Sequence, residues 1–304
     1  MRLLWDSALG LLIVAGGLLG LALPFGKMAT QAGVPGMLWA FVVSCGAGSV
    51  LLIGLVLRRV PLPLTAHRLR YYFVTAAVSY AAPNFMLFTA IPHLGAGYAG
   101  IMYTISPIVT LMMSLLLGVR RPNMLGVAGI IVGFVGAVIV TLTRGEAGRP
   151  ADIFWIVVGL LIPVLLGAGN IYRTYDWPKG AGPIELAAGS HLAAGVLLLL
   201  GIVATGNAGS FALLPGMPLL VLAQVISAST MFAFFFRLQA VGGPVYLSQV
   251  GYVAAAVALF SGIFFLGERY QLLTWIGAAI TVLGVTMTTK AQAREQPPLN
   301  SPRA

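Results

Sequence analysis

Polar side chains that interrupt long apolar runs are the residues of this chain with the means to do chemistry. Lys27 follows Pro24 by three residues inside such a run, so its ammonium group either meets a carboxylate on a solute or reaches the lipid headgroups. Asn84 and Asn170 can each donate and accept hydrogen bonds, to a bound solute or to a neighbouring helix. Because polar groups are costly in lipid, such residues usually face a cavity or another helix. These residue types point to recognition by hydrogen bonding and by charge.

Two glutamines extend this polar set. Gln224 belongs to a stripe of Ser and Thr side chains within its own apolar run. Gln249 lies between Tyr246 and Tyr252 at three-residue spacing, so the three share roughly one helix face. An amide flanked by two phenols suits an amphipathic solute, and two tyrosines of the run 95–117 suit the same cavity unless they are interfacial anchors. The candidate substrate-binding residues are Lys27, Asn84, Tyr98, Tyr103, Asn170, Gln224, Gln249 and Tyr252.

Two titratable residues are candidates for proton coupling. His191 lies roughly 12 Å along its predicted helix at 1.5 Å per residue, where it either carries a coupled proton or packs as a neutral ring. Glu185 lies in the first turn of the same run, where a helix N-terminus stabilises a carboxylate. We prefer that capping role over a proton relay. Since no Asp or Glu lies near the centre of any run, coupling to protons and movement down a gradient both stay open.

The composition indicates that this chain is embedded in a lipid bilayer. Of its residues, 59% are hydrophobic and only 8% are charged, whereas a soluble domain carries roughly a quarter of its residues as charged side chains. We therefore predict an all-α integral membrane protein whose partner is the lipid bilayer. Hydropathy predicts ten spans. They lie at roughly 7–30, 36–57, 71–91, 95–117, 123–142, 153–172, 183–205, 216–237, 244–266 and 271–289.

The net charge of +10 is best interpreted by position. With ten spans and an N-terminus inside the cell, most Lys and Arg residues fall on the cytoplasmic side, as the positive-inside rule requires. Arg173 is counted there, in the loop after the sixth span. Both termini are predicted to be cytoplasmic, the basic loops to determine topology, and no nucleic-acid partner is expected.

The segment 94–141 is echoed by the segment 241–288. Each is an apolar run, then Leu-Gly-x-Arg, then a run with two glycines seven residues apart. The matched glycines are Gly129 and Gly136 in the first copy and Gly277 and Gly284 in the second. Because each copy has five spans, the second must insert upside down, which predicts a 5+5 inverted-topology repeat. The predicted units are 1–147, 148–290 and a disordered cytoplasmic tail, 291–304.

Four prolines fall inside the predicted spans. A proline removes one hydrogen bond of the helix ladder and clashes with the preceding turn. In lipid, the freed carbonyl needs another partner or a water-filled cavity. Each proline therefore marks either a kink beside a cavity or a static bend. The four are Pro24, Pro83, Pro107 and Pro163.

The sequence predicts neither an enzyme nor a cofactor. It contains no Gly-x-Ser-x-Gly or His-Glu-x-x-His motif, no pair of intramembrane aspartates and no Walker A loop. The histidines are far apart and Cys45 is the only cysteine, so no zinc-type metal site and no intrachain disulfide is expected.

The layout resembles the drug/metabolite transporter superfamily, in particular its EamA-domain members. The resemblance rests on the duplication and on a closing block in each half, Ser106-Pro107 to Leu117-Gly118 and Pro244 to Leu266-Gly267-Glu268-Arg269. It implies a carrier of the bacterial inner membrane that works by alternating access. This chain departs from the family where Val119 replaces the usual Glu and where the ninth span lacks a proline equivalent to Pro107. Substrate contacts are therefore expected to differ between the halves.

The function expected from this resemblance is secondary transport of small organic metabolites, with export of amino acids or related compounds. A flippase of a lipid-linked substrate is the nearest alternative, because relatives in the superfamily move such cargo. A structural membrane subunit is a third, against which the internal polar residues argue mildly.

Overall fold

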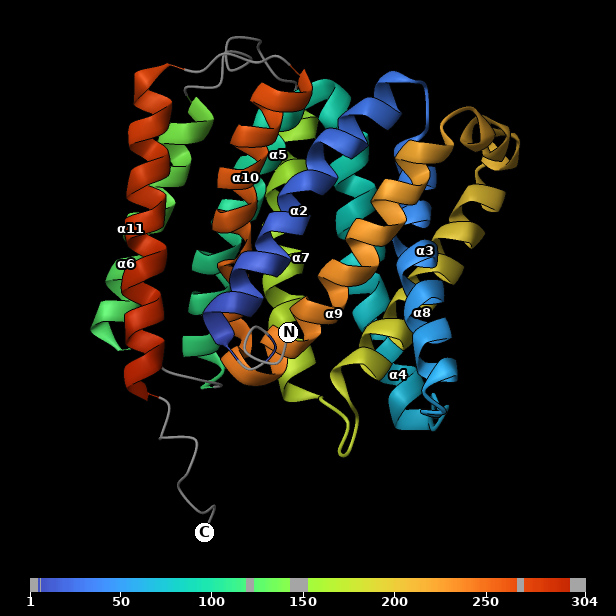
Figure 1. Ribbon diagram of the computed structural model, residues 1–304, viewed down its shortest axis with the longest axis horizontal. Coiled ribbons are helices and arrows are strands. Elements are labelled where there is room, and N and C mark those ends of the chain that lie inside the picture. The colour runs from blue at the N-terminus through green and yellow to red at the C-terminus, as the bar shows by residue number, and fades with distance from the viewer. Residues whose placement is uncertain (1–4, 6, 119–122, 143–152, 267–270, 296–304) are drawn as a thin grey trace.

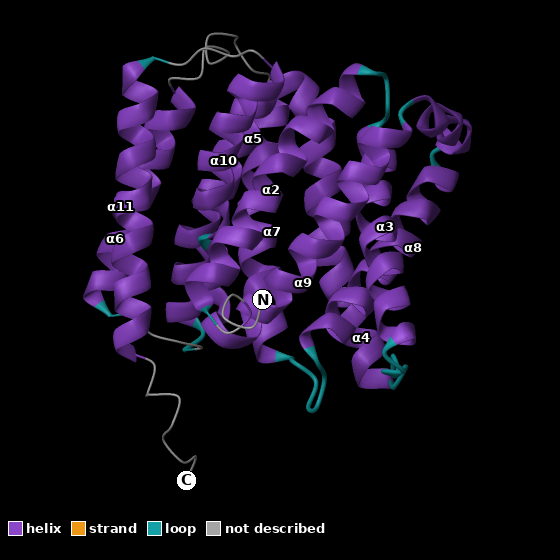
Figure 2. Ribbon diagram, viewed as in Figure 1, coloured by secondary structure: helices purple, strands orange, loops and turns teal. Residues whose placement is uncertain are grey.

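The computed structural model describes residues 5, 7–118, 123–142, 153–266 and 271–295. Every regular element within these ranges is a helix, and most of the helices run roughly side by side (Figures 1 and 2). Among the described residues, six helices are long and apolar enough to cross a membrane. Shorter apolar helical stretches add Ile105–Leu116, Met124–Gly136 and Leu272–Thr288. The chain is thus a multi-pass membrane protein.

In the first half of the chain, the first two helices and the last one match predicted spans closely. They are α2 (Ala8–Gln31), α3 (Gly36–Leu57), α4 (Ala66–Thr75), the π-helix η1 (Ala76–Ala81), α5 (Ala82–Leu116) and α6 (Met124–Leu142). The Ser7 hydroxyl accepts a hydrogen bond from the Gly10 amide at 3.2 Å and so begins α2. Gly33, with φ of +86°, turns the chain from α2 into α3.

The predicted spans 71–91 and 95–117 are not separated in the structure. Their boundary falls inside α5, and the first of them is divided among α4, η1 and the start of α5. A continuous helix satisfies every backbone N–H and C=O group internally, which lipid requires and a loop does not provide. The structure thus keeps helical hydrogen bonding where the sequence pattern predicts a short loop.

The π turn η1 has a cause in Pro83. Proline has no N–H, so the carbonyl of Ser79 loses its α-helical donor. The residues just before Pro83 take the wider π spacing, Ala76–Ala81. The irregularity expected at this proline is therefore a local π turn, and Asn84 follows it directly.

The second half contains α7 (Ile153–Tyr175), α8 (Pro183–Ala204), the 3-10 helix η2 (Asn207–Gly216), α9 (Pro218–Ser248), α10 (Val250–Leu266) and α11 (Leu272–Glu295). Gly243 interrupts α9 with φ of +71° and ψ of −178°, a conformation that only glycine adopts readily. This kink lies just before residue 244, where a new span was predicted. α11 continues into the predicted tail 291–304, of which 296–304 lie outside the described residues.

Helices from the first and second halves of the chain pack against each other. α6 lies beside α11 at one edge of the bundle, and α3 lies beside α8 toward the other (Figure 1). The first contact uses the matched glycines: a Cβ on Gly129 would lie 2.8 Å from the Gly284 carbonyl oxygen, and a Cβ on Gly136 would lie 2.6 Å from that of Gly277. Glycine at these positions lets the two backbones touch.

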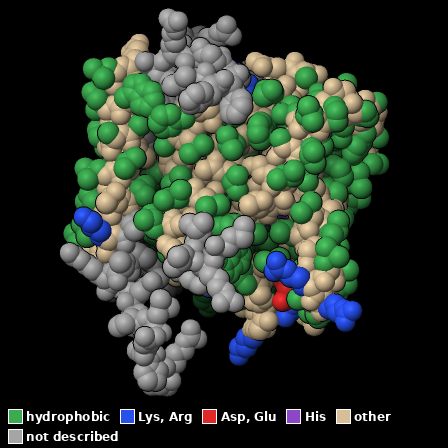
Figure 3. All heavy atoms as spheres, viewed as in Figure 1, with side chains coloured by type: hydrophobic (Ala, Val, Ile, Leu, Met, Phe, Trp, Pro, Cys, Tyr) green, Lys and Arg blue, Asp and Glu red, His purple; other side chains and the backbone are tan. Residues whose placement is uncertain are grey.

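The outer surface is apolar along the flanks of the bundle. Ile53 is 58% exposed and Leu57 is 79% exposed. Figure 3 shows apolar side chains over the flanks, with most of the visible Lys and Arg side chains toward the lower edge of the view. The start of α2, the start of α4 and the end of α11 lie toward that same edge (Figure 1). This surface matches a membrane slab with basic residues gathered at one face.

Candidate substrate-binding site

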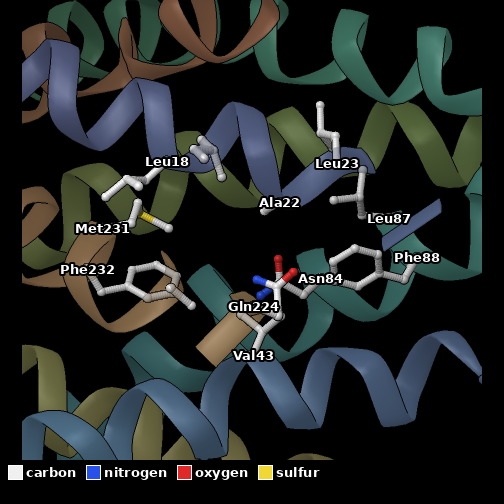
Figure 4. Close-up of a pocket in the computed structure, with 12 residues that line it drawn as sticks. Leu18, Ala22, Leu23, Val43, Asn84, Leu87, Phe88, Gln224, Met231 and Phe232 are labelled. Carbon is white, nitrogen blue, oxygen red and sulfur yellow. The ribbon is translucent and has the colours of Figure 1, made fainter. Parts of the chain in front are cut away.

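A small cavity lies between helices from both halves of the chain. α2, α3 and α5 line it from the first half and α9 from the second (Figure 4). Its lining on α2 runs from Leu18 to Leu23, near the middle of that helix, so the cavity lies about halfway through the bundle. The lining residues are Leu18, Leu19, Ala22, Leu23, Val43, Asn84, Leu87, Phe88, Gln224, Ala228, Met231 and Phe232.

Two amides are the polar groups of this mostly apolar lining. Gln224 is fully buried, and neither its Oε1 nor its Nε2 has a hydrogen-bond partner among the described residues. Asn84, just after the π turn, brings the second amide to the same cavity, and Figure 4 shows both amides between apolar side chains. An unsatisfied buried amide costs about 1–3 kcal/mol. A solute that hydrogen-bonds Gln224 recovers that free energy.

An aromatic layer adjoins the cavity, formed by Phe232, Tyr80 and His191. The ring centroid of His191 lies 3.7 Å from that of Phe232 and 4.0 Å from that of Tyr80. His191 is fully buried, and neither ring nitrogen has a hydrogen-bond partner within the described ranges. Burial without a polar partner favours the neutral ring. In these ranges His191 also joins no group that could hold a metal ion.

A buried arginine lies beside this layer. The side chain of Arg173 is 1% exposed. Its Nε donates to Gln239 Oε1 at 3.2 Å, and its Nη2 donates to Asn170 Oδ1 at 2.6 Å. Its guanidinium carbon lies 5.6 Å from the ring centroid of Tyr80 and 5.1 Å from that of Phe235. Arg173 is therefore an internal residue, and its interpretation as a loop charge is wrong.

Arg173 was not predicted as a site residue because it ends an apolar run, where a charge usually marks the membrane surface. One signal was available. Asn170 and Arg173 are three residues apart and so share a helix face. Because Asn170 was a candidate binding residue, the cation of Arg173 on the same helix face could have been chosen as well. Asn170 also donates to Thr110 Oγ1 at 3.2 Å, so its amide ties α7 to α5.

Asp176, between α7 and α8, joins the two halves at the end where α4 begins. Its carboxylate accepts hydrogen bonds from Arg70 Nη2 at 2.8 Å and Tyr172 Oη at 2.6 Å, and lies 3.0 Å from His67 Nε2. Burial raises the pKa of this carboxyl, but the hydrogen bonds from Tyr172, His67 and Arg70 outweigh it and lower the pKa below 3.8. Asp176 is thus ionised at neutral pH.

A second ion pair lies nearby, between Arg68 Nη1 on α4 and Glu185 Oε2 on α8, at 2.8 Å. Glu185 is in the first turn of α8, as predicted, and gains this partner besides the helix terminus. We call Arg68, Arg70, Asp176 and Glu185 the inner closure. It links α4 of the first half to α7 and α8 of the second.

Hydroxyl groups fill the interval between the inner closure and the aromatic layer. Tyr71, Thr75 and Ser79 follow one another at four-residue spacing along α4 and η1, so they share one face. All three hydroxyl groups are buried without a hydrogen-bond partner among the described residues. This hydroxyl stripe offers polar contacts to a solute that leaves the cavity toward the closure.

The opposite end of the cavity is narrowed by Phe88. A Cβ on Gly26 would lie 2.5 Å from Phe88 Cε1, and a Cβ on Gly36 would lie 2.7 Å from the Phe88 carbonyl carbon. The turn between α2 and α3 therefore sits directly on α5. Lys27 is the residue after Gly26 and is half-buried there, so it lies near this end of the cavity.

Two of the predicted binding residues, Gln249 and Tyr252, lie away from the cavity. Gln249 Oε1 accepts a hydrogen bond from Thr288 Oγ1 on α11. Tyr252 Oη donates to the Ile130 carbonyl oxygen on α6 at 2.9 Å. Neither residue lines the cavity: Gln249, between α9 and α10, is bonded to α11, and Tyr252 ties α10 to α6. Tyr98 and Tyr103 belong to α5, but their side chains lie outside the described part of the chain.

The first part of the chain matches the model of a known protein family. Residues 6–142 match the model of the EamA-like transporter family, the domain of the drug/metabolite transporter superfamily. These residues form an EamA-like transporter domain. The resemblance inferred from the sequence is confirmed, and three helices of the EamA-like domain line the cavity. Members of this family are membrane transporters.

The fold extends this likeness beyond the EamA-like domain. A solved structure titled "Crystal structure of protein" is similar with a TM-score of 0.71, covering 94% of this chain and 99% of that chain at 18% identity. At that identity the match shows a shared fold, which includes the second half. No curated protein matches the sequence significantly.

Proposed function

We propose that this chain is a secondary transporter that carries a small organic metabolite through the cavity by alternating access. One observation carries the proposal: the Gln224 amide is buried in a cavity between the halves with no hydrogen-bond partner among the described residues. A transporter of this family needs a site that is polar enough to bind and is reachable from either side.

The proposal includes ten spans arranged as a 5+5 inverted repeat, with halves 1–147 and 148–290. The glycine contacts between α6 and α11 support it. Gly129 corresponds to Gly277 and Gly136 to Gly284, yet Gly129 meets Gly284 and Gly136 meets Gly277. Such crossed pairing is what a two-fold relation between equivalent helices produces. The same relation accounts for the packing of α3 on α8.

The arrangement corresponds to a state closed at one end. The inner closure and the hydroxyl stripe lie on one side of the aromatic layer, and the cavity lies on the other. Opening requires the ion pairs between α4 and the α7–α8 region to separate, which moves one half against the other. We place the inner closure at the cytoplasmic side of a bacterial inner membrane, with both termini there, because the basic residues gather at that end.

The cargo we propose is an amino acid or a related compound, and the direction is export. Two amides next to aliphatic and aromatic side chains suit a solute with a polar group and an apolar part. A lipid-linked cargo would need a lateral opening between helices. A lipid-flipping assay on the same vesicles distinguishes that alternative.

The test is uptake of a labelled amino-acid pool into proteoliposomes, with and without an imposed pH gradient. Saturable uptake above protein-free vesicles supports the proposal. Acceleration by the gradient favours proton coupling, with His191 and Glu185 as the candidate groups, whereas indifference favours facilitated exchange. Absence of uptake, together with lipid flipping in the same vesicles, would replace the proposal by the flippase alternative.

A further inference from the structure

We infer that the cargo presents a carboxylate or phosphate group, and that Arg173 is the side chain that binds this group. The inference rests on the proposed function, which it deepens by naming the charge of the cargo. It starts from a buried cation whose neighbours are neutral.

Arg173 lacks a counter-charge among the described residues. The described carboxylates Asp176 and Glu185 pair with other residues, and no carboxylate of the described ranges lies within ion-pair distance of Arg173. Its hydrogen-bond acceptors are the neutral side-chain amides of Asn170 and Gln239. Removing a guanidinium from water is costly unless an anion and hydrogen bonds replace the water. The protein alone supplies the hydrogen bonds and lacks the anion.

The aromatic rings around Arg173 offset only part of this cost. The guanidinium carbon lies 5.1 to 5.9 Å from the ring centroids of Phe235, Tyr80 and Phe236. Rings stabilise a cation through their electron-rich faces and do not neutralise it. They also exclude water, which strengthens the attraction to an anion that enters. A planar guanidinium is the side chain best matched to the two oxygens of a carboxylate or phosphate.

Two residues near this guanidinium carry hydroxyl groups without hydrogen-bond partners among the described residues. A Cβ on Gly169 would lie 3.3 Å from Arg173 Nη1 and would clash with Ser79 Oγ, so this hydroxyl and the guanidinium both pack closely against Gly169. Ser79 Oγ and Tyr80 Oη are buried without hydrogen-bond partners among the described residues. The guanidinium, the nearby Ser79 hydroxyl and the hydroxyl of the neighbouring residue Tyr80 are donors that one anionic group could use together.

The position of Arg173 gives this group a place in the transport cycle. Tyr80 lies against Arg173 on one side and against Phe232, a lining residue of the cavity, on the other, with ring centroids 5.3 Å apart. The cavity therefore holds the cargo first by its amides, and displacement of the aromatic layer brings the anionic group to Arg173. Opening of the inner closure then releases it.

The experiment uses the purified full chain, both in proteoliposomes and in detergent. Uptake of labelled L-leucine and of labelled glycerol 3-phosphate separates a carboxylate source from a phosphate source. L-Leucinamide, which lacks the carboxylate, competes with leucine. In detergent, the shift in melting temperature caused by each compound reports binding without transport. Three variants accompany the wild type: Arg173→Gln, Arg173→Lys, and Arg237→Gln as the matched control, a half-buried arginine over the Trp5 ring.

We expect one of the two acids to be taken up and to raise the melting temperature, and we expect the amide to compete at least about tenfold more weakly than leucine. Arg173→Gln loses both effects, Arg173→Lys keeps part of them, and Arg237→Gln resembles the wild type.

Wild-type uptake by Arg173→Gln, or equal competition by the amide, overturns the inference and leaves the proposed function standing. A melting shift that depends on Arg173 in a chain without uptake supports the anion site and overturns the transport proposal. If neither acid shifts the melting temperature or is taken up, both fall.

Discussion

Gly136 and Gly277 touch through their backbones in a reciprocal way. A Cβ on Gly136 would lie 2.6 Å from the carbonyl oxygen of Gly277, and a Cβ on Gly277 would lie 2.8 Å from the carbonyl oxygen of Gly136. Neither position tolerates a side chain without separating α6 from α11. Because these glycines belong to different copies of the sequence echo, the duplication can be tested through its packing.

Gly136→Ala is expected to lower the free energy of unfolding by about 1–3 kcal/mol, since the added methyl group meets backbone atoms that cannot rotate away. The measurement is the thermal midpoint in detergent. Gly17→Ala is the matched control, because a Cβ on Gly17 meets nothing within 4 Å. Equal midpoints for the two variants would contradict the close helix contact.

Gln224→Leu is expected to leave the thermal midpoint unchanged or to raise it, because it replaces an unpaired buried amide by an apolar group of similar size, which relieves about 1–3 kcal/mol. The same change should reduce transport strongly, since the solute loses its hydrogen-bond partner. Gln31→Leu, an exposed change at the end of α2, serves as the control. A marked loss of stability in Gln224→Leu would show that this amide has a structural partner.

Asp176→Asn should loosen the inner closure. The pKa of Asp176 is lowered in the folded protein, so its stabilising effect is complete above the ordinary value of 3.8 and is lost as the pH falls through the lower folded value. Between pH 5 and 8 this group therefore gives no pH dependence. Removing its charge mimics strong acid and should weaken the closure by about 1 kcal/mol, or about fivefold in the open population.

That population is measured by maleimide labelling of Ser79→Cys, in a chain whose Cys45 is replaced by Ala. Ser79 lies on the hydroxyl stripe, which the closure shields. Labelling should be several-fold faster with Asp176→Asn and unchanged with Lys179→Gln, an exposed change in the same connection. Identical rates in both variants would mean that Asp176 does not hold this end closed.

Gly243→Ala should destabilise the chain by about 1–3 kcal/mol, because φ of +71° with ψ of −178° is strained for any residue with a side chain. Thermal unfolding in detergent measures this cost. Gly209→Ala, at a glycine with open space around it, provides the comparison. If alanine is tolerated equally at both sites, the kink in α9 does not depend on glycine.

The spans could be predicted because lipid imposes a length and a composition on them. α3 begins and ends where hydropathy placed it, at Gly36 and Leu57. The boundary between the third and fourth spans could not be placed, since α5 continues across it and satisfies its backbone groups internally. The matched glycines were visible as a spacing in the sequence, but their mutual contact arises only when the two halves meet.

The candidate site was predicted in part. Asn84 and Gln224 were chosen as amides inside apolar runs, and both line the cavity. Gln249 was chosen by the same rule, yet Thr288 satisfies it. Nothing local distinguishes these amides, because the partner of each lies on a helix distant in sequence. Arg173 was assigned to a loop, since its burial depends on rings from η1 and α9.

The most direct test of transport through the cavity compares two changes on α9. Ala228 lines the cavity and is 3% exposed, whereas Leu222 is 55% exposed on the flank of the bundle. With both variants folded, Ala228→Phe should reduce the initial rate of uptake at least about tenfold by filling the cavity, and Leu222→Phe should leave it unchanged. Uptake at the wild-type rate by Ala228→Phe would show that the solute takes another route.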